Sequence, residues 1–389
     1  MSRVIDSGNR VGRPDRMMTG SERTVGADSS AQTERHACML RSMMGLGLWG
    51  LEFIQLAHDF IEIRGWAVAP EGDCTVVSFA VNDKEFDQID YSSPRADVGQ
   101  IFWYIPNSWK SGFVCRAYLS TEEVFANGYA VFKFINSNTG LPFNEKHNYY
   151  YCDPLADKPL LPDSERRKRV HGNEDEITFR LEGYSTYMKL KLAMRRLFGR
   201  DYGDFSRILD WGCGCGRMTR YFKDLKWGSI TGVDIDADNV NWCQQHLNFG
   251  RFLTIPLHPP TNLNDSSFDL LIGISVFAHL REGEQYEWLS ELRRIASEEA
   301  ILLMSVHGGM AVCRSNFLFS LFEAWKTRGF LDVGPNPDLD GVIGEQDYYR
   351  NTFHTSDYVR ENWSKYFEIV DIMPGYVGNL QDLVIMRKV

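Results

Sequence analysis

Three glycines near the middle of the chain, Gly212, Gly214 and Gly216, alternate with other residues and directly follow a short apolar stretch. Glycine adopts positive φ angles without strain and has no side chain, so this run permits a sharp turn and lets backbone N–H groups approach a ligand closely. The stretch 207–210 before the glycines, with Ile208 and Leu209 at its centre, is typical of a strand, and residues 217–225 after them are typical of a helix. The feature therefore predicts a strand–loop–helix unit of an α/β sheet, with a ligand cleft at the carboxyl end of the strand.

The region from about residue 176 to residue 389 continues this alternation of strands and helices. We expect helices over residues 177–198, 217–225, 237–247 and 286–295. We expect strands over residues 207–210, 229–234, 252–255, 268–274, 300–306, 367–372 and 382–386. Only a short loop joins the last two strands, so they should form a hairpin that makes the final strand antiparallel to its neighbours. The predicted fold class is α/β, a doubly wound, Rossmann-like sheet of seven strands.

The residues before this α/β domain (176–389) divide into three predicted parts. Residues 1–45 are polar and without periodicity, which predicts a disordered tail. Residues 46–140 contain short β-branched and aromatic runs separated by turn signals, which predict a smaller all-β sandwich domain. Residues 141–175 contain four prolines and predict a connector, in which the charged run 164–169 is expected to be a solvated helix face.

Composition excludes several classes of partner. With 42 basic and 52 acidic residues the net charge is −10, which argues against nucleic acid because phosphate binding requires clustered Lys and Arg. The eight cysteines show no zinc-ligand spacing, so we expect reduced thiols and no metal site. No signal peptide and no apolar stretch of membrane-spanning length is visible, so we expect a cytoplasmic protein without a membrane partner.

The spacing of the glycines separates two kinds of nucleotide ligand. A dinucleotide fingerprint, GxGxxG, requires a third glycine where this chain has Arg217. The acidic residue two positions before the first glycine, Asp210, would repel a pyrophosphate but suits an ammonium group. These residues favour a ligand with a positive charge over NAD, while a tight turn without any ligand is the alternative.

A second acidic residue, Asp234, follows the second predicted strand, 18 residues after Gly216. A carboxylate at such a strand tip can accept hydrogen bonds from both hydroxyls of a ribose, as the acid about 20 residues downstream does in nucleotide-binding folds. The alternative role is an N-cap of the next helix, for which Asp236 is also placed. The order and spacing of the two motifs together predict a nucleoside site.

These motifs resemble those of class I S-adenosylmethionine-dependent methyltransferases of the small-molecule type, and the resemblance covers residues 176–389. It implies that the glycine loop passes the methionine part of the cofactor S-adenosyl-L-methionine, with Asp210 near its ammonium group. It also implies that Asp234 binds the ribose and that Ile235 packs on the adenine. Residues 275–280, which begin with Ser275, resemble the segment beside the transferred methyl group.

One departure from the family pattern concerns the loop after the third strand. Residues 256–260 lack the Asp that many relatives direct at the adenine amine, and we expect backbone groups near Leu257 to replace it. The cofactor-binding residues predicted in this way are Asp210, Gly212, Gly214, Gly216, Asp234, Ile235, Leu257 and Ser275.

Two histidines are the candidate catalytic residues. His279 and His307 follow the fourth and fifth predicted strands, where ligands bind in open α/β sheets. A histidine there can remove the proton of a hydroxyl nucleophile near pH 7, or it can merely cap a helix or bond a carbonyl. The long insertion 308–360 is a candidate lid over the substrate, with burial of its aromatic residues against the sheet as the alternative.

The predicted function is transfer of a methyl group to an oxygen, or as second choice a nitrogen, of a small molecule or glycan by in-line displacement. The alternatives are a non-catalytic, methyltransferase-like binding scaffold and, third, a nucleotide-cofactor oxidoreductase. The residues identify neither the acceptor nor the oligomeric state.

Overall fold

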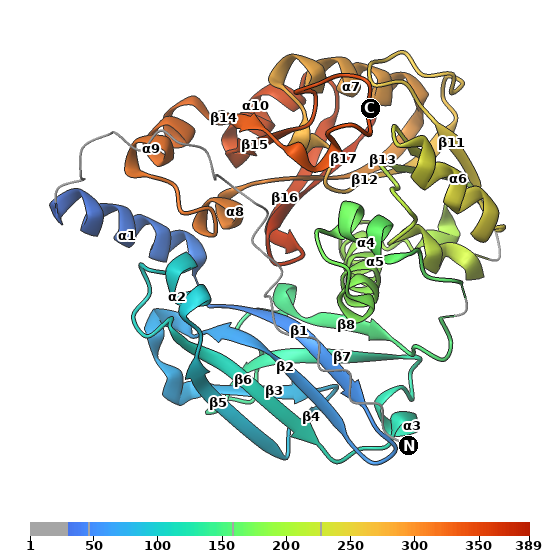
Figure 1. The fold of residues 1–389 in the computed structure, drawn as a ribbon. Helices are drawn as coiled ribbons and strands as arrows, with labels where there is room; N and C mark the ends of the chain where they lie inside the picture. Colours follow the sequence, from blue (N-terminus) through green and yellow to red (C-terminus); the bar gives the residue numbers. More distant parts are fainter. Residues whose placement is uncertain (1–29, 46, 158, 226–227) are drawn as a thin grey trace.

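The computed structural model describes residues 30–45, 47–157, 159–225 and 228–389. Figure 1 shows an α/β part in the upper half of the view and two small sheets in the lower half, with helix α5 (Glu176–Phe198) between them. The chain therefore joins two differently built parts, and α5 contacts both.

A seven-stranded sheet forms the centre of the α/β part. Its strands are β9 (Arg207–Trp211), β10 (Ser229–Asp234), β11 (Arg251–Thr254), β12 (Phe268–Gly273), β13 (Ala296–Val306), β16 (Glu368–Val377) and β17 (Gln381–Arg387). Their spatial order is β11-β10-β9-β12-β13-β17-β16, and β17 is antiparallel to both of its neighbours. The predicted doubly wound sheet with a terminal hairpin is confirmed.

Apolar residues cover both faces of this sheet. On β12, Leu270 packs with α5 on one face, and Leu271 packs on the other face against α7 (Glu282–Ile295) and α10 (Ser356–Trp363). This double burial accounts for the unbroken apolar strands of the sequence. The helix expected at 217–225 is instead the short 3-10 segment η5 (Thr219–Asp224), while α6 (Ala237–His246) follows β10 as expected.

The N-terminal part is a β-sandwich of two four-stranded sheets. One sheet has the order β1 (Leu48–Leu56), β2 (Ile61–Val68), β6 (Lys110–Ala117), β5 (Gln88–Pro94), and the other has β4 (Lys84–Glu85), β3 (Val77–Val81), β7 (Tyr129–Asn136), β8 (Tyr149–Cys152). Side chains of both sheets share one core, in which Phe79 and Phe113 have ring centroids 4.3 Å apart. An all-β domain is thus confirmed in this region.

Two predicted boundaries need correction. Residues 149–152 lie in the predicted connector but form edge strand β8, because Tyr149 and Tyr151 fill the sandwich core. Residues 30–44 lie in the predicted disordered tail but form helix α1 (Ser30–Met44), because its buried side chains pack with those of helices α8 (Gly309–Cys313) and α9 (Phe319–Arg328). The rest of that predicted tail, 1–29, lies outside the described residues.

The insertion between β13 and β16 carries α8, α9, α10 and a small antiparallel sheet of β14 (Phe330–Pro335) and β15 (Arg350–His354). Within the stretch 317–325, the aromatic residues Phe317, Phe322 and Trp325 are buried as the alternative expected, but they pack with α1 and the sandwich side and not against the sheet. Within the described residues, no helix combines the length and apolar character needed to cross a membrane.

Candidate functional site

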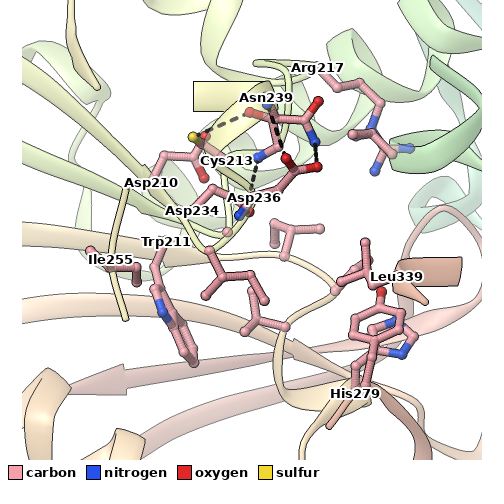
Figure 2. A pocket seen from close by; sticks show the side chains of 18 of the residues that line it. Asp210, Trp211, Cys213, Arg217, Asp234, Asp236, Asn239, Ile255, His279 and Leu339 are labelled. Atoms are coloured by element: carbon pink, nitrogen blue, oxygen red, sulfur yellow. Dashed lines mark hydrogen bonds between the residues drawn. The ribbon is translucent and has the colours of Figure 1, made fainter. Parts of the chain in front are cut away.

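A pocket lies at the carboxyl ends of β9, β10 and β12, where the glycine loop, the tip of β10 and residues 274–280 come together. Figure 2 shows Asp210 and Arg217 in the upper part of this pocket and His279 and Leu339 in the lower part. Helix α4 (Ser164–His171), α5 and the insertion complete the walls. The position agrees with the rule that open α/β sheets bind ligands beyond the carboxyl ends of their strands.

Asp210 is a buried carboxylate at the end of β9. The hydroxyl of Thr219 donates a hydrogen bond to its Oδ2 atom, and the side chain lines the pocket. Burial, helped by the nearby charge of Asp234, raises the pKa of Asp210 to about 7. A buried carboxylate of this kind is best neutralised by a cationic ligand group, which fits the ammonium group expected here.

Asp234 connects the tip of β10 to the glycine loop. Its Oδ2 atom accepts a hydrogen bond of 2.7 Å from the backbone of Gly214, and its Oδ1 atom accepts one of 2.9 Å from the backbone of Asp236. Burial raises the pKa of Asp234 to about 6. Each oxygen of an ionised carboxylate has two lone pairs, so both retain one for a ligand diol.

The N-cap alternative for Asp234 is settled by its neighbour. Asp236 caps α6, since its Oδ1 accepts hydrogen bonds from the backbone N–H groups of Asp238 at 3.0 Å and Asn239 at 3.3 Å. Asp234 is therefore left to face the pocket.

The three glycines divide into two groups. All have positive φ, with values of 77°, 52° and 76° for Gly212, Gly214 and Gly216. Gly212 and Gly214 line the pocket, whereas Gly216 does not. A Cβ atom on Gly216 would lie 2.5 Å from Cδ1 of Leu247, so this glycine permits the loop to pack on the end of α6.

The apolar wall of the pocket includes Ile235 and also Ile255 and Trp288. Leu257, by contrast, does not line the pocket. Its carbonyl accepts a hydrogen bond of 2.5 Å from the hydroxyl of Tyr348. The structure thus does not bring Leu257 to the site, because a tyrosine of the insertion occupies the backbone group expected to bind the adenine.

Ser275 lines the pocket in a fixed conformation with a φ of 61°. The backbone N–H of Ser275 donates a hydrogen bond of 2.8 Å to Oγ of Ser305. Oγ of Ser275 accepts one of 2.9 Å from Nε2 of Gln381. These bonds from β13 and β17 hold the turn that leads to His279.

His279 is on the pocket wall with its ring held in one orientation. Its Nδ1 atom lies 2.7 Å from the carbonyl oxygen of Arg350, and its ring stacks on Tyr349 at 4.1 Å between centroids. A carbonyl only accepts hydrogen bonds, so Nδ1 carries the proton and Nε2 is the basic nitrogen of the neutral ring.

His307 lies behind His279 and outside the pocket lining. The two ring centroids are 5.6 Å apart, and the His307 ring is buried beside Phe353. Burial lowers the pKa of His307 to about 4, so it is neutral at pH 7. The structure separates the two candidate bases and places only His279 at the pocket.

Sequence reasoning missed part of the wall. Arg169 and Val170 of α4 line the pocket, as do Leu339, Tyr348 and Tyr349 of the insertion. The charged run 164–169 is only partly a solvated face, because Arg169 pairs with Asp236 at 3.0 Å and with Asp238 at 2.8 Å. The sequence does show the basic run and the pair Tyr348 and Tyr349. Their roles could not be read from it, because the residues that they contact are distant in the sequence. Among the described residues, no group of three or more His, Cys, Asp or Glu is arranged to hold a metal ion.

Comparison with known proteins supplies the class. Residues 209–304 match the family described as "Methyltransferase domain". Cyclopropane-fatty-acyl-phospholipid synthase of Escherichia coli K12 is 29% identical over 102 residues, which are 26% of this chain and 26% of that protein. The chain therefore spans about a quarter of the length of the curated relative that it matches.

Solved structures were compared as well. The magnesium protoporphyrin IX methyltransferase of Synechocystis PCC 6803 is 18% identical, with a TM-score of 0.37 over 58% of this chain and 94% of its own. An N-methyltransferase of Bradyrhizobium japonicum WM9 is 12% identical, with a TM-score of 0.37 over 58% of this chain and 99% of its own.

Residues 209–304 thus match a methyltransferase domain, and they lie within the seven-stranded, Rossmann-like sheet of the C-terminal part. This part is similar to the class I methyltransferases, whose cofactor is S-adenosylmethionine. The pocket fits that cofactor, because it offers a buried carboxylate for an ammonium group and a second carboxylate with free lone pairs for a ribose.

Proposed function

We propose that this chain transfers the methyl group of S-adenosylmethionine to an oxygen, or as second choice a nitrogen, of a small molecule or glycan. The observation that carries the choice of oxygen is His279, whose Nδ1 proton is fixed on the Arg350 carbonyl at the pocket wall. A hydroxyl nucleophile needs a base, and this histidine provides one.

The cofactor is held by groups at the glycine-loop end of the pocket. Asp210 would bind the ammonium group, and the backbone of Gly212 and Gly214 would lie along the methionine chain. Asp234 would accept hydrogen bonds from the ribose hydroxyls. Ile235 and Ile255 supply apolar surface for the adenine. When bound, the cofactor supplies an electrophilic methyl group at the far end of this arrangement.

The chain's own contribution to the reaction is positioning and proton removal. The pocket walls hold the acceptor in line with the methyl group and exclude water. Nε2 of His279 would accept the proton of the acceptor hydroxyl as that oxygen takes the methyl group and releases the sulfur of the cofactor as a neutral thioether. The Tyr349 ring stacked on His279 keeps the imidazole in the orientation that this requires.

Two rival functions remain to be separated by experiment. A nucleotide-cofactor oxidoreductase is disfavoured by Arg217 and by the negative charge of Asp210 at the loop. A non-catalytic scaffold is disfavoured by His279, which a pure binding protein has no need to orient. We also propose a cytoplasmic location, on the basis of thiols that form no disulfide among the described residues.

The test is incubation of the purified protein with S-adenosylmethionine labelled on its methyl group and with fractionated small molecules and glycans from cell extract. We expect label in a product that is stable to mild base, as a methyl ether is, and expect His279→Gln to slow its formation about 100-fold. A protein that binds the cofactor but labels no fraction would support the scaffold, and label in a product of another class would exclude the proposed acceptor.

A further inference from the structure

Arg217 stands where a dinucleotide-binding loop would have its third glycine, and its half-buried side chain lines the pocket. The stem of the side chain packs on α5, since a Cβ atom on Gly183 would lie 3.1 Å from its Cγ. Its Nη1 atom lies 2.8 Å from Nδ1 of His171, at the end of α4. The two contacts hold the side chain between α5 and the end of α4, two helices that also line the pocket.

The hydrogen-bond partner of Arg217 carries no negative charge. Burial and the charge of Arg217 lower the pKa of His171 to about 3, so this imidazole is neutral at pH 7. Among the ion pairs formed within the described residues, none includes Arg217, whereas nearby Arg169 pairs with Asp236 and Asp238. A guanidinium cannot lose its proton, so Arg217 keeps its positive charge at the pocket while no carboxylate forms a direct ion pair with it among the described residues.

Asp210 provides the opposite charge in the same pocket. Its carboxylate lies near enough to feel the charge of Arg217, which favours its ionised form. Figure 2 shows both residues in the upper part of the pocket, around the glycine loop. The same pocket therefore presents a carboxylate and a guanidinium, which Figure 2 shows on its left and right sides, and these two charges complement a zwitterionic α-amino acid.

We propose that Arg217 binds the α-carboxylate of the cofactor's methionine end, while Asp210 binds the ammonium group of the same end. This assignment rests on the proposed function and makes Arg217 the residue by which the pocket distinguishes amino-acid-bearing nucleosides from those without that group. Guanidinium–carboxylate hydrogen bonds are strong and directional, which suits such a role.

Calorimetry with two ligands tests the assignment. S-adenosylhomocysteine carries the amino acid group, and 5′-methylthioadenosine lacks it. We expect Arg217→Ala to weaken binding of S-adenosylhomocysteine about 10- to 100-fold, the range of a lost charged hydrogen bond, and to leave the affinity for 5′-methylthioadenosine unchanged. Arg217→Lys should recover part of the loss because it restores the charge.

Two controls separate recognition from a structural role. His171→Ala removes the partner of Arg217 but keeps the guanidinium, so it should retain the preference for S-adenosylhomocysteine. The analogue of S-adenosylhomocysteine without its carboxylate, titrated into the unchanged protein, should bind as weakly as S-adenosylhomocysteine binds Arg217→Ala, and this arm does not depend on any variant folding.

The outcomes are distinguishable. Equal weakening of both ligands in Arg217→Ala, the same loss in His171→Ala, or unchanged binding of the decarboxylated analogue would overturn the role of Arg217 while leaving the proposed function intact. An unchanged protein that binds none of these nucleosides would overturn the proposed function and the assignment with it.

Discussion

The backbone N–H of Gly214 donates a hydrogen bond of 2.7 Å to Oδ2 of Asp234. The acid at the tip of the second strand thus holds the loop that follows the first strand. The two sequence motifs are one structural unit, because the residue expected to bind the ribose also fixes the glycine turn that passes beside it.

Replacing Asp234 by Ala should weaken binding of S-adenosylhomocysteine by about 2–4 kcal/mol, since it removes ribose hydrogen bonds and releases the Gly214 N–H. The measurement is a calorimetric titration of each protein. Asp238→Ala is the matched control, because Asp238 caps nothing, is half exposed and pairs only with Arg166 and Arg169 in its described contacts. Equal affinities of the Asp234→Ala variant and the unchanged protein would rule out the ribose assignment.

Replacing His279 by Gln should lower kcat about 100-fold, as is typical for loss of a general base, with little change in the affinity for S-adenosylhomocysteine. The readout is the methylation rate against pH with an acceptor from the labelling screen. His307→Asn is the control, because that ring is outside the pocket and its pKa of about 4 keeps it neutral. A normal rate and pH profile in His279→Gln would show that the reaction needs no base at this position.

Replacing Tyr348 by Phe should lower the free energy of unfolding by about 1–3 kcal/mol, the usual range for buried groups that lose their partner. The lost hydroxyl donates a hydrogen bond of 2.5 Å to the Leu257 carbonyl and accepts one of 3.2 Å from Nε1 of Trp288. Urea unfolding measures the change. Tyr118→Phe is the control, since Tyr118 is 51% exposed and should have almost no effect. Equal losses in both variants would show that the two hydrogen bonds of the Tyr348 hydroxyl do not stabilise the fold.

Asp382 predicts a pH dependence of stability. Burial raises its pKa to about 7, so between the ordinary carboxyl pKa and pH 7 the folded chain binds more protons here than the unfolded chain. Stability must then fall as pH rises through this range. Its Oδ1 accepts the Gly375 N–H at 2.9 Å, which an amide oxygen can also do.

The melting temperature of the unchanged protein should therefore fall more between pH 5 and pH 8 than that of the variant Asp382→Asn. The variant should gain in melting temperature relative to the unchanged protein over the same interval. Thermal melts at the two pH values provide the measurement. Parallel pH dependences in the two proteins would show that Asp382 does not carry this effect.

The sheet and the cofactor loop were predictable because their signals are local. Buried parallel strands are continuous apolar runs, and the glycines at 212, 214 and 216 are required by positive φ angles that few other residues adopt. The same holds for Asp210 and Asp234, whose positions at strand tips follow from strand lengths alone.

The parts that were not predicted depend on contacts between distant residues. Helix α1 is largely polar and is stabilised by packing on α8 and α9, which lie more than 260 residues later. The basic run in α4 contributes Arg169, which forms ion pairs with Asp236 and Asp238 at the start of α6. Tyr348 reaches Leu257 from a loop rich in Gly, Pro and Asp, in which no periodicity marks a buried residue.

A crystal structure of the protein with S-adenosylhomocysteine tests the central claim most directly. We predict the ligand in the pocket at the ends of β9 and β10, with both ribose hydroxyls on the Asp234 carboxylate and the ammonium group beside Asp210. A ligand bound elsewhere, or one in this pocket whose ribose does not contact Asp234, would contradict the account.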